Sequence, residues 1–155
     1  MKIIVYSYGK IKNKHIYELE QNYLEKIKRF ISIESIEIKE AKNFSLLPVN
    51  VQRKITEKTF LQIITPDSLC VLLDSKGNLY DSETFASVLK SWLNFNKKKL
   101  IFLIAGPYGL TEDFKKNFVL LSLSKLTFTH ELTRIILLEQ LYRAFTILNN
   151  ISYHY

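Results

Sequence analysis

Hydrophobic and polar positions follow two different periods along this 155-residue chain. Short β-branched and aromatic runs, typical of strands, alternate with longer stretches whose apolar residues recur at helical spacing. We expect strands at 2–8, 33–38, 68–73, 100–104 and 118–123, and helices at 13–29, 48–64, 82–95 and 130–149. This order predicts an α/β fold, a mostly parallel sheet flanked by helices, in one domain covering residues 1–155.

The first helical stretch has a clear start and a predicted inner face. Asn13 is expected to cap it. Five apolar side chains at helical spacing are expected to face the core: Ile16, Leu19, Tyr23, Ile27 and Phe30. The strand at 68–73 is continuously apolar, which indicates burial on both faces. Residues 74–78 after it, including Gly77, are expected to form a turn.

Candidate ligand-binding loops follow two strands in the last third of the chain. The strand at 100–104 ends in Ala105-Gly106-Pro107-Tyr108-Gly109, and the strand at 118–123 ends in a hydroxyl-rich turn at 124–129. We expect these ends to lie side by side, at the carboxyl edge where open α/β sheets bind ligands. Leu73 and Asp74 could form a further wall there, or only a turn.

The final helical stretch is apolar almost all round, which predicts burial on more than one side, against its own sheet and a second subunit. Its polar exceptions are Arg134, Glu139, Gln140 and Arg143. Arg143 is spaced to form an ion pair with Glu139 one turn earlier. Alternatively, it could bind a phosphate or a ligand carboxylate.

Composition favours a polyanionic partner. The chain has 22 Lys and Arg against 15 Asp and Glu, a formal charge of +7, together with 9 Tyr and 10 Phe. This combination suits RNA binding, although a lysine-rich lineage would produce the same charge. We expect no membrane span, no signal peptide and no metal site, since Cys70 is the only cysteine. A cytoplasmic protein follows.

The C-terminal motifs resemble a known family. The Ala105-Gly106 loop, LSLSKLTFTHEL at 121–132, RIILLEQLYRAFTI at 134–147 and Tyr153-His154-Tyr155 occur in one order. They resemble the RlmH family, the 23S ribosomal RNA pseudouridine N3-methyltransferases of the SPOUT class. The resemblance implies an S-adenosylmethionine-dependent enzyme with a C-terminal trefoil knot, acting on the assembled ribosome. It also implies a homodimer whose active sites are built across the subunit boundary.

The same resemblance implies roles for individual residues. The cofactor-binding positions would be Leu73, Ala105, Gly106, Leu123, Ser124, Lys125, Leu126, Thr127 and Phe128. The RNA-facing, catalytic positions would be His130, Arg143, Tyr153 and His154. Removal of the pseudouridine N3 proton calls for a general base. The candidates are His154 with Tyr153, and His130, with solvent as the alternative acceptor of the proton. Arg143 would hold a phosphate.

Three positions depart from the family pattern. Ala105 replaces a usual glycine and requires a negative φ, Thr129 replaces a usual proline, and Tyr155 replaces a usual basic residue. Two alternative functions stay open: a SPOUT methyltransferase acting on transfer RNA, and a non-catalytic basic RNA- or ribosome-binding module.

Overall fold

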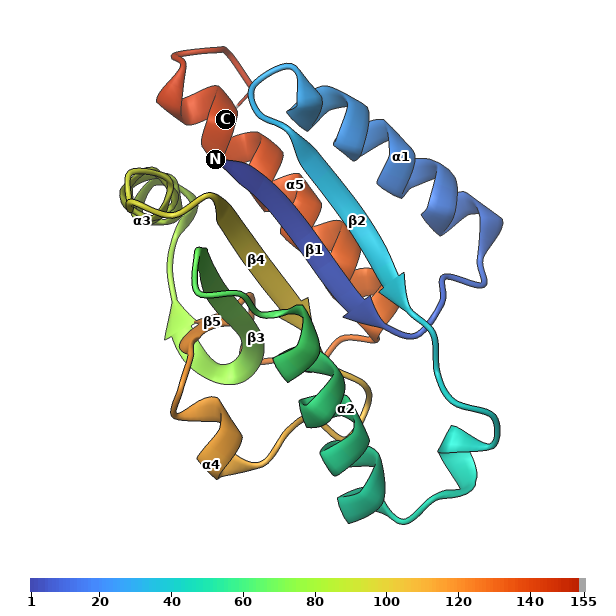
Figure 1. Ribbon diagram of the computed structural model, residues 1–155. Coiled ribbons are helices and arrows are strands. Elements are labelled where there is room, and N and C mark those ends of the chain that lie inside the picture. The colour runs from blue at the N-terminus through green and yellow to red at the C-terminus, as the bar shows by residue number, and fades with distance from the viewer. Residues whose placement is uncertain (154–155) are drawn as a thin grey trace.

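The computed structural model describes residues 1–153 (Figure 1). Its strands are β1 (Lys2–Tyr8), β2 (Ile33–Ile38), β3 (Ser68–Leu79), β4 (Lys99–Ile104) and β5 (Val119–Ser122). Its helices are α1 (Lys14–Lys28), α2 (Val49–Ile63), α3 (Ser82–Leu93), α4 (Glu112–Lys115) and α5 (His130–Leu148), with a short 3₁₀ helix η1 (Phe44–Leu46). The predicted elements are therefore present in the predicted order.

The five strands form one sheet in the order β2-β1-β4-β3-β5, and every pairing is parallel. One correction concerns β4 and β5, which we expected to be neighbours. β3 lies between them and pairs with both, so three strand ends rather than two meet at the carboxyl edge. Hydrophobic periodicity identifies strands but does not determine their order across a sheet.

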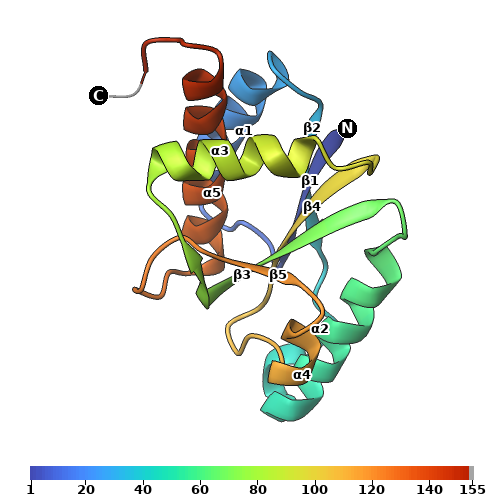
Figure 2. The ribbon, with the colours of Figure 1, turned by 90° about the vertical axis from the view of Figure 1, so that its left-hand side faces the viewer.

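Helices cover both faces of the sheet, giving three layers (Figures 1 and 2). Ile3, Val5 and Phe102 pack toward α1, α3 and α5 on one face. Ile4, Tyr8 and residues of β3 and β4 pack toward η1 and α2 on the other. Within one chain, α5 thus lies against the sheet with α1 and α3 on its flanks, and this accounts for its apolar sides without a second subunit.

The predicted turn at 74–78 is wrong, because these residues continue β3. Leu73 and Asn78 both pair with Leu121, so the intervening residues form a bulge. A Cβ on Gly77 would lie 2.7 Å from the main chain of Leu120 and Leu121. Glycine is therefore needed for the close approach of β3 to β5, and its role as a turn residue is secondary.

The inner face of α1 also differs from the prediction. Asn13 caps the helix as expected, accepting hydrogen bonds from the main-chain N–H groups of His15 and Ile16. However, Leu19 is 43% exposed, whereas Glu20 is 3% exposed. The buried face of α1 is thus rotated relative to the predicted one. An apolar pattern could not reveal this, because Glu20 is buried through a charged partner, Arg134.

Candidate active site

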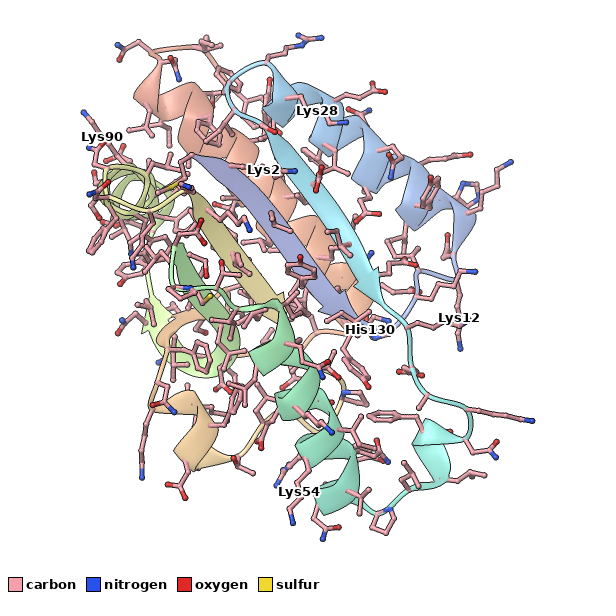
Figure 3. The ribbon with its side chains drawn as sticks, viewed as in Figure 1. Lys2, Lys12, Lys28, Lys54, Lys90 and His130 are labelled. Carbon is pink, nitrogen blue, oxygen red and sulfur yellow. The ribbon has the colours of Figure 1, made fainter. Side chains whose placement is uncertain are left out.

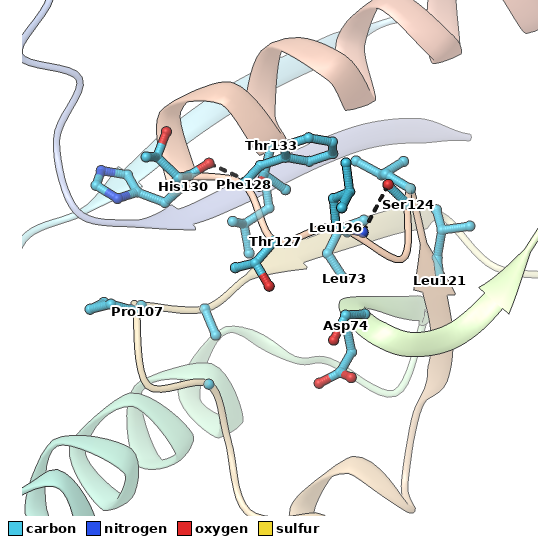
Figure 4. Close-up of a pocket in the computed structure, with 17 residues that line it drawn as sticks. Leu73, Asp74, Pro107, Leu121, Ser124, Leu126, Thr127, Phe128, His130 and Thr133 are labelled. Atoms are coloured by element: carbon cyan, nitrogen blue, oxygen red, sulfur yellow. Dashed lines mark hydrogen bonds between the residues drawn. The ribbon is translucent and has the colours of Figure 1, made fainter.

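A cavity of about 500 Å³ opens at the carboxyl ends of β3, β4 and β5. This volume lies within the range of pockets that hold small molecules and cofactors. Figure 4 shows Leu73 and Asp74, where the bulge of β3 begins, on one side, with Thr127, Phe128 and His130 from the β5–α5 connection and the start of α5 across from them. The loop after β4, with Pro107, forms another edge.

Eight of the nine predicted cofactor positions line this cavity; they are Leu73, Ala105, Gly106, Leu123, Ser124, Leu126, Thr127 and Phe128. The ninth, Lys125, is exposed and does not contribute to the lining. The lining contains further residues that we did not assign to cofactor binding: Ser75, Ile104, Pro107, Gly109, Leu121, Thr129 and Thr133. Three of these, Ile104, Pro107 and Thr129, directly flank assigned positions, so for them proximity in sequence was the available signal.

The loop between β5 and α5 is held by hydrogen bonds between side chains and main chain. Ser122 Oγ donates to the carbonyl of Ser124 at 2.9 Å, and Ser124 Oγ accepts from the amide of Leu126 at 3.0 Å. Within residues 1–153, the main chain of 125–128 makes no backbone–backbone hydrogen bond. Buried or bound main-chain groups require partners, so this segment can supply donors and acceptors to a ligand.

Two departures from the family pattern fit this backbone. Among the described non-glycine residues, positive φ occurs only at Asn43 and Asn150, so Ala105 has the negative φ that its methyl group requires. Thr129 caps α5, its Oγ1 accepting from the amide of Leu132 at 3.3 Å. A proline side chain offers no such acceptor.

Asp74 is held at the cavity by an ion pair with Lys115 of α4. Lys115 Nζ lies 2.7 Å from Asp74 Oδ2, and both side chains are nearly buried. Burial opposes ionisation of Asp74, but the hydrogen bonds from Lys115 and from the amide of Lys76 outweigh it and lower the pKa of Asp74. Burial likewise disfavours the charged ammonium, yet hydrogen bonds to Asp74 and Glu112 raise the pKa of Lys115. The carboxylate therefore stays ionised at neutral pH.

His130, the first residue of α5, lies in the cavity wall. Its Nε2 atom is buried and, within the described residues, has no hydrogen-bond partner. It faces Gly9 at the end of β1, where an added Cβ would lie 3.2 Å from Nε2. The imidazole is therefore packed between the cavity and the β1–α1 loop.

Arg143 and Tyr153 do not lie in the cavity lining. Arg143 lies near the other end of α5, where Nη2 contacts Glu139 Oε1 at 2.6 Å and the guanidinium lies 4.9 Å from the centre of the Tyr153 ring. The ion pair expected from spacing is thus present. Burial and the neighbouring Tyr23 raise the pKa of Tyr153 to about 12, so its phenol stays protonated at neutral pH. His154, the predicted base, lies outside the described residues, as does Tyr155.

The site is thus a ligand cavity at the carboxyl edge of a parallel sheet, formed by three strand ends and the N-terminus of a long helix, which is typical of an α/β enzyme. A family model described as a predicted SPOUT methyltransferase matches residues 1–154. The chain belongs to this family, and the expectation of a SPOUT methyltransferase is confirmed. The trefoil knot stays a prediction from family membership.

Individual relatives match along their full length. A protein of Flavobacterium psychrophilum is 36% identical over 156 residues, covering 100% of this chain and 99% of its own length. One of Malacoplasma penetrans is 40% identical over 157 residues, and one of Coprothermobacter proteolyticus is 36% identical over 155 residues; each alignment covers 99% of both chains. All three are named ribosomal RNA large subunit methyltransferase H.

The described residues contain neither a membrane-spanning helix nor a cluster of metal ligands. No helix within residues 1–153 has the length and apolar character to cross a bilayer. The same residues contain no group of three or more His, Cys, Asp or Glu side chains arranged to hold a metal ion.

Proposed function

We propose that this protein transfers a methyl group from S-adenosylmethionine to N3 of a pseudouridine in large-subunit ribosomal RNA, in the cytoplasm and on the assembled ribosome. The observation that carries the proposal is the cavity at the ends of β3, β4 and β5, lined by eight of the nine cofactor positions implied by the family. Family membership and the names of the full-length relatives support the reaction and the RNA class.

The residues present fit this cofactor. The main chain of 125–128, which makes no backbone–backbone hydrogen bond within residues 1–153, offers donors and acceptors to an adenosine, and the apolar side chains of Leu73, Leu123 and Leu126 can enclose its base. When bound, S-adenosylmethionine supplies an electrophilic methyl group on a sulfonium. The protein's task is to hold the acceptor nitrogen in line with that group.

For the reaction to balance, the N3 proton of the acceptor must leave as the new N–C bond forms. Tyr153 does not take it, because its pKa of about 12 keeps the phenol protonated at neutral pH. We assign this proton to His154, with Tyr153 donating a hydrogen bond and Arg143 holding a phosphate. His130, in the cavity wall, positions the acceptor base.

We further propose a homodimer, because within the described residues α5 holds Arg143 far from His130. Thirteen residues of α5 separate His130 from Arg143, roughly 20 Å along a helix. A second copy can place its Arg143 and Tyr153 against the cavity of the first, completing each site from two chains.

The reaction is tested by methyl transfer from labelled S-adenosylmethionine to whole ribosomes, to free ribosomal RNA and to transfer RNA, each assayed separately and followed by nucleoside analysis. We expect N3-methylpseudouridine, formed on ribosomes. Methylated transfer RNA instead would establish the first alternative function. Absence of cofactor binding by calorimetry would leave the non-catalytic module.

Cofactor placement is tested with one bulky substitution inside the cavity and one outside. Thr127→Trp fills the cavity and should weaken S-adenosylmethionine binding by at least about tenfold through steric overlap. Leu61→Trp is the matched control, since Leu61 is 61% exposed on α2 and does not line the cavity. Equal affinity in both variants would contradict the assigned binding site.

The shared site is tested by mixing two inactive variants, Thr127→Trp and Arg143→Ala. In a mixed dimer, one site carries both defects and the other carries neither. Random exchange of subunits should therefore restore about a quarter of the wild-type sites. No recovery, with mixed dimers verified by mass spectrometry, would show that each site belongs to one chain.

A further inference from the structure

The β1–α1 loop, residues 9–13, lies outside the cavity but packs directly on its wall. Gly9, at a φ of +94°, leaves so little space beside the His130 imidazole that an added Cβ would lie 3.2 Å from Nε2. The amide of Lys12 donates to Glu131 Oε1 at 2.6 Å. The loop is therefore joined to the first turn of α5, where the cavity begins.

A buried charge cluster fixes the course of this loop. Arg134 is 0% exposed, and its Nη2 donates to the carbonyl of Gly9 at 3.2 Å. Its Nη1 lies 3.2 Å from both Glu20 and Glu37, and Glu37 in turn accepts from the amide of Ile11 at 2.8 Å. Charged hydrogen bonds of this kind are the strongest in proteins. The main chain of the loop is therefore fixed at Gly9 by Arg134 and at Ile11 by Glu37.

Two lysines project from this fixed backbone. Lys10 and Lys12 alternate with the buried residues Gly9 and Ile11, and both are exposed. Neither forms an ion pair with any residue in 1–153. Figure 3 shows Lys12 near His130 at the carboxyl edge of the sheet. The pair thus presents unneutralised ammonium groups beside the wall of the cavity.

We propose that Lys10 and Lys12 bind backbone phosphates of the RNA strand whose target nucleotide occupies the cavity. The proposal rests on the RNA substrate assigned above and deepens it by identifying the surface that the RNA crosses. The ammonium groups match phosphate as flexible point charges, while the fixed loop sets where the strand passes. Glu37 and Glu131 form no ion pair with either lysine within residues 1–153; their Oε1 atoms accept instead from the amides of Ile11 and Lys12.

The test compares two double variants that remove the same charge. Lys10→Ala with Lys12→Ala removes the proposed phosphate contacts. Lys90→Ala with Lys98→Ala is the matched control, since both lysines are exposed and lie at the opposite edge, near the end of α3 and the start of β4. Binding to ribosomal RNA and ribosomes is measured by filter retention across a range of salt concentrations, beside methyl transfer and S-adenosylmethionine affinity.

We expect the Lys10/Lys12 variant to bind RNA about tenfold more weakly, with a salt slope reduced by about 0.7 for each lysine if the strand is single. S-adenosylmethionine affinity should not change, and the loss of activity should appear in KM rather than kcat. The control should resemble the wild type. Equal RNA binding by the two double variants would overturn the proposal. RNA binding decides the outcome even if the wild type methylates nothing, a result that would count against the proposed reaction alone.

Discussion

The two ends of α5 each carry an arginine, and the two side chains are held very differently. Arg134, one turn from the cavity, is 0% exposed and contacts two carboxylates and a carbonyl from three other segments. The Arg143 side chain, near the other end, is 22% exposed and pairs with Glu139 on its own helix. Arg134 joins distant parts of the chain, whereas Arg143 pairs with a carboxylate one turn away and lies over the Tyr153 ring.

This difference indicates which arginine can exchange its partner for a ligand. Releasing Arg134 would leave two carboxylates and a carbonyl buried without their partner, which is costly. Breaking the pair between Arg143 and Glu139 costs less, because both side chains keep some exposure, 22% and 19%. Arg134 is therefore expected to maintain the fold, and Arg143 is the one suited to accept an RNA phosphate.

The largest expected effect is on stability, at the cavity end. Arg134→Met should lower the free energy of unfolding by about 3–5 kcal/mol, because it leaves Glu20 buried without its charged partner. Arg143→Met, the matched substitution, should lower it by about 1 kcal/mol or less. Urea denaturation of both variants measures the free energy of unfolding. An equal decrease in the two variants would contradict the proposed difference between the two arginines.

The next effect concerns activity, at the other end. Arg143→Ala should reduce methyl transfer to ribosomes by about 100-fold, equivalent to about 2.7 kcal/mol of transition-state stabilisation. S-adenosylmethionine affinity should stay within about twofold of the wild type, since Arg143 does not line the cavity. Steady-state kinetics and calorimetry measure the two quantities. Full activity in this variant would end the role assigned to Arg143.

A smaller effect tests how tightly the cavity end is packed. Gly77→Ala should lower the free energy of unfolding by about 1–3 kcal/mol, since its Cβ would lie 2.7 Å from the main chain of β5. Gly106→Ala is the control, because its Cβ would lie 3.7 Å from Tyr8 Cδ1, an ordinary contact. Thermal unfolding distinguishes them, and an equally stable Gly77 variant would show that β5 can move.

The smallest effect depends on pH and concerns Asp74. Asp74→Asn should cost about 1–2 kcal/mol at pH 7 by weakening the contact with Lys115. The pKa of Asp74 is lowered by folding, so its stabilisation is complete above the unfolded value of 3.8 and is lost as pH falls through the folded value. The stability difference between wild type and variant should therefore shrink below pH 4. A difference that is constant from pH 7 to pH 3 would contradict this account.

Sequence reasoning identified the strands, the four long helices and the cap Asn13, because these depend on local chemistry. It also placed the loops after β4 and β5 at the cavity, since both lie directly after strands. The position of β3 between β4 and β5 was missed, as were the bulge at Gly77 and the burial of Glu20. Each of these depends on a partner distant in sequence, which periodicity cannot reveal.

The predicted roles of the site residues show the same distinction between local sequence and distant partners. Residues after strands, such as Gly106 and Thr127, were brought together by the sheet itself. Arg143 and Tyr153 resemble family positions, but within one chain they do not line the cavity. The fold of a single chain therefore gives no reason to assign them to the site. Their roles stay predictions, to be decided by the mixed-dimer experiment.

The pairing of Glu20 with Arg134 has a consequence for how the protein is made. The two residues are 114 positions apart. At about 5–20 residues per second, a nascent chain carries Glu20 for roughly 6–23 s before Arg134 is synthesised. During that interval α1 cannot settle against the sheet without burying a lone carboxylate. We therefore expect α1 to dock only after Arg134 of α5 has been synthesised.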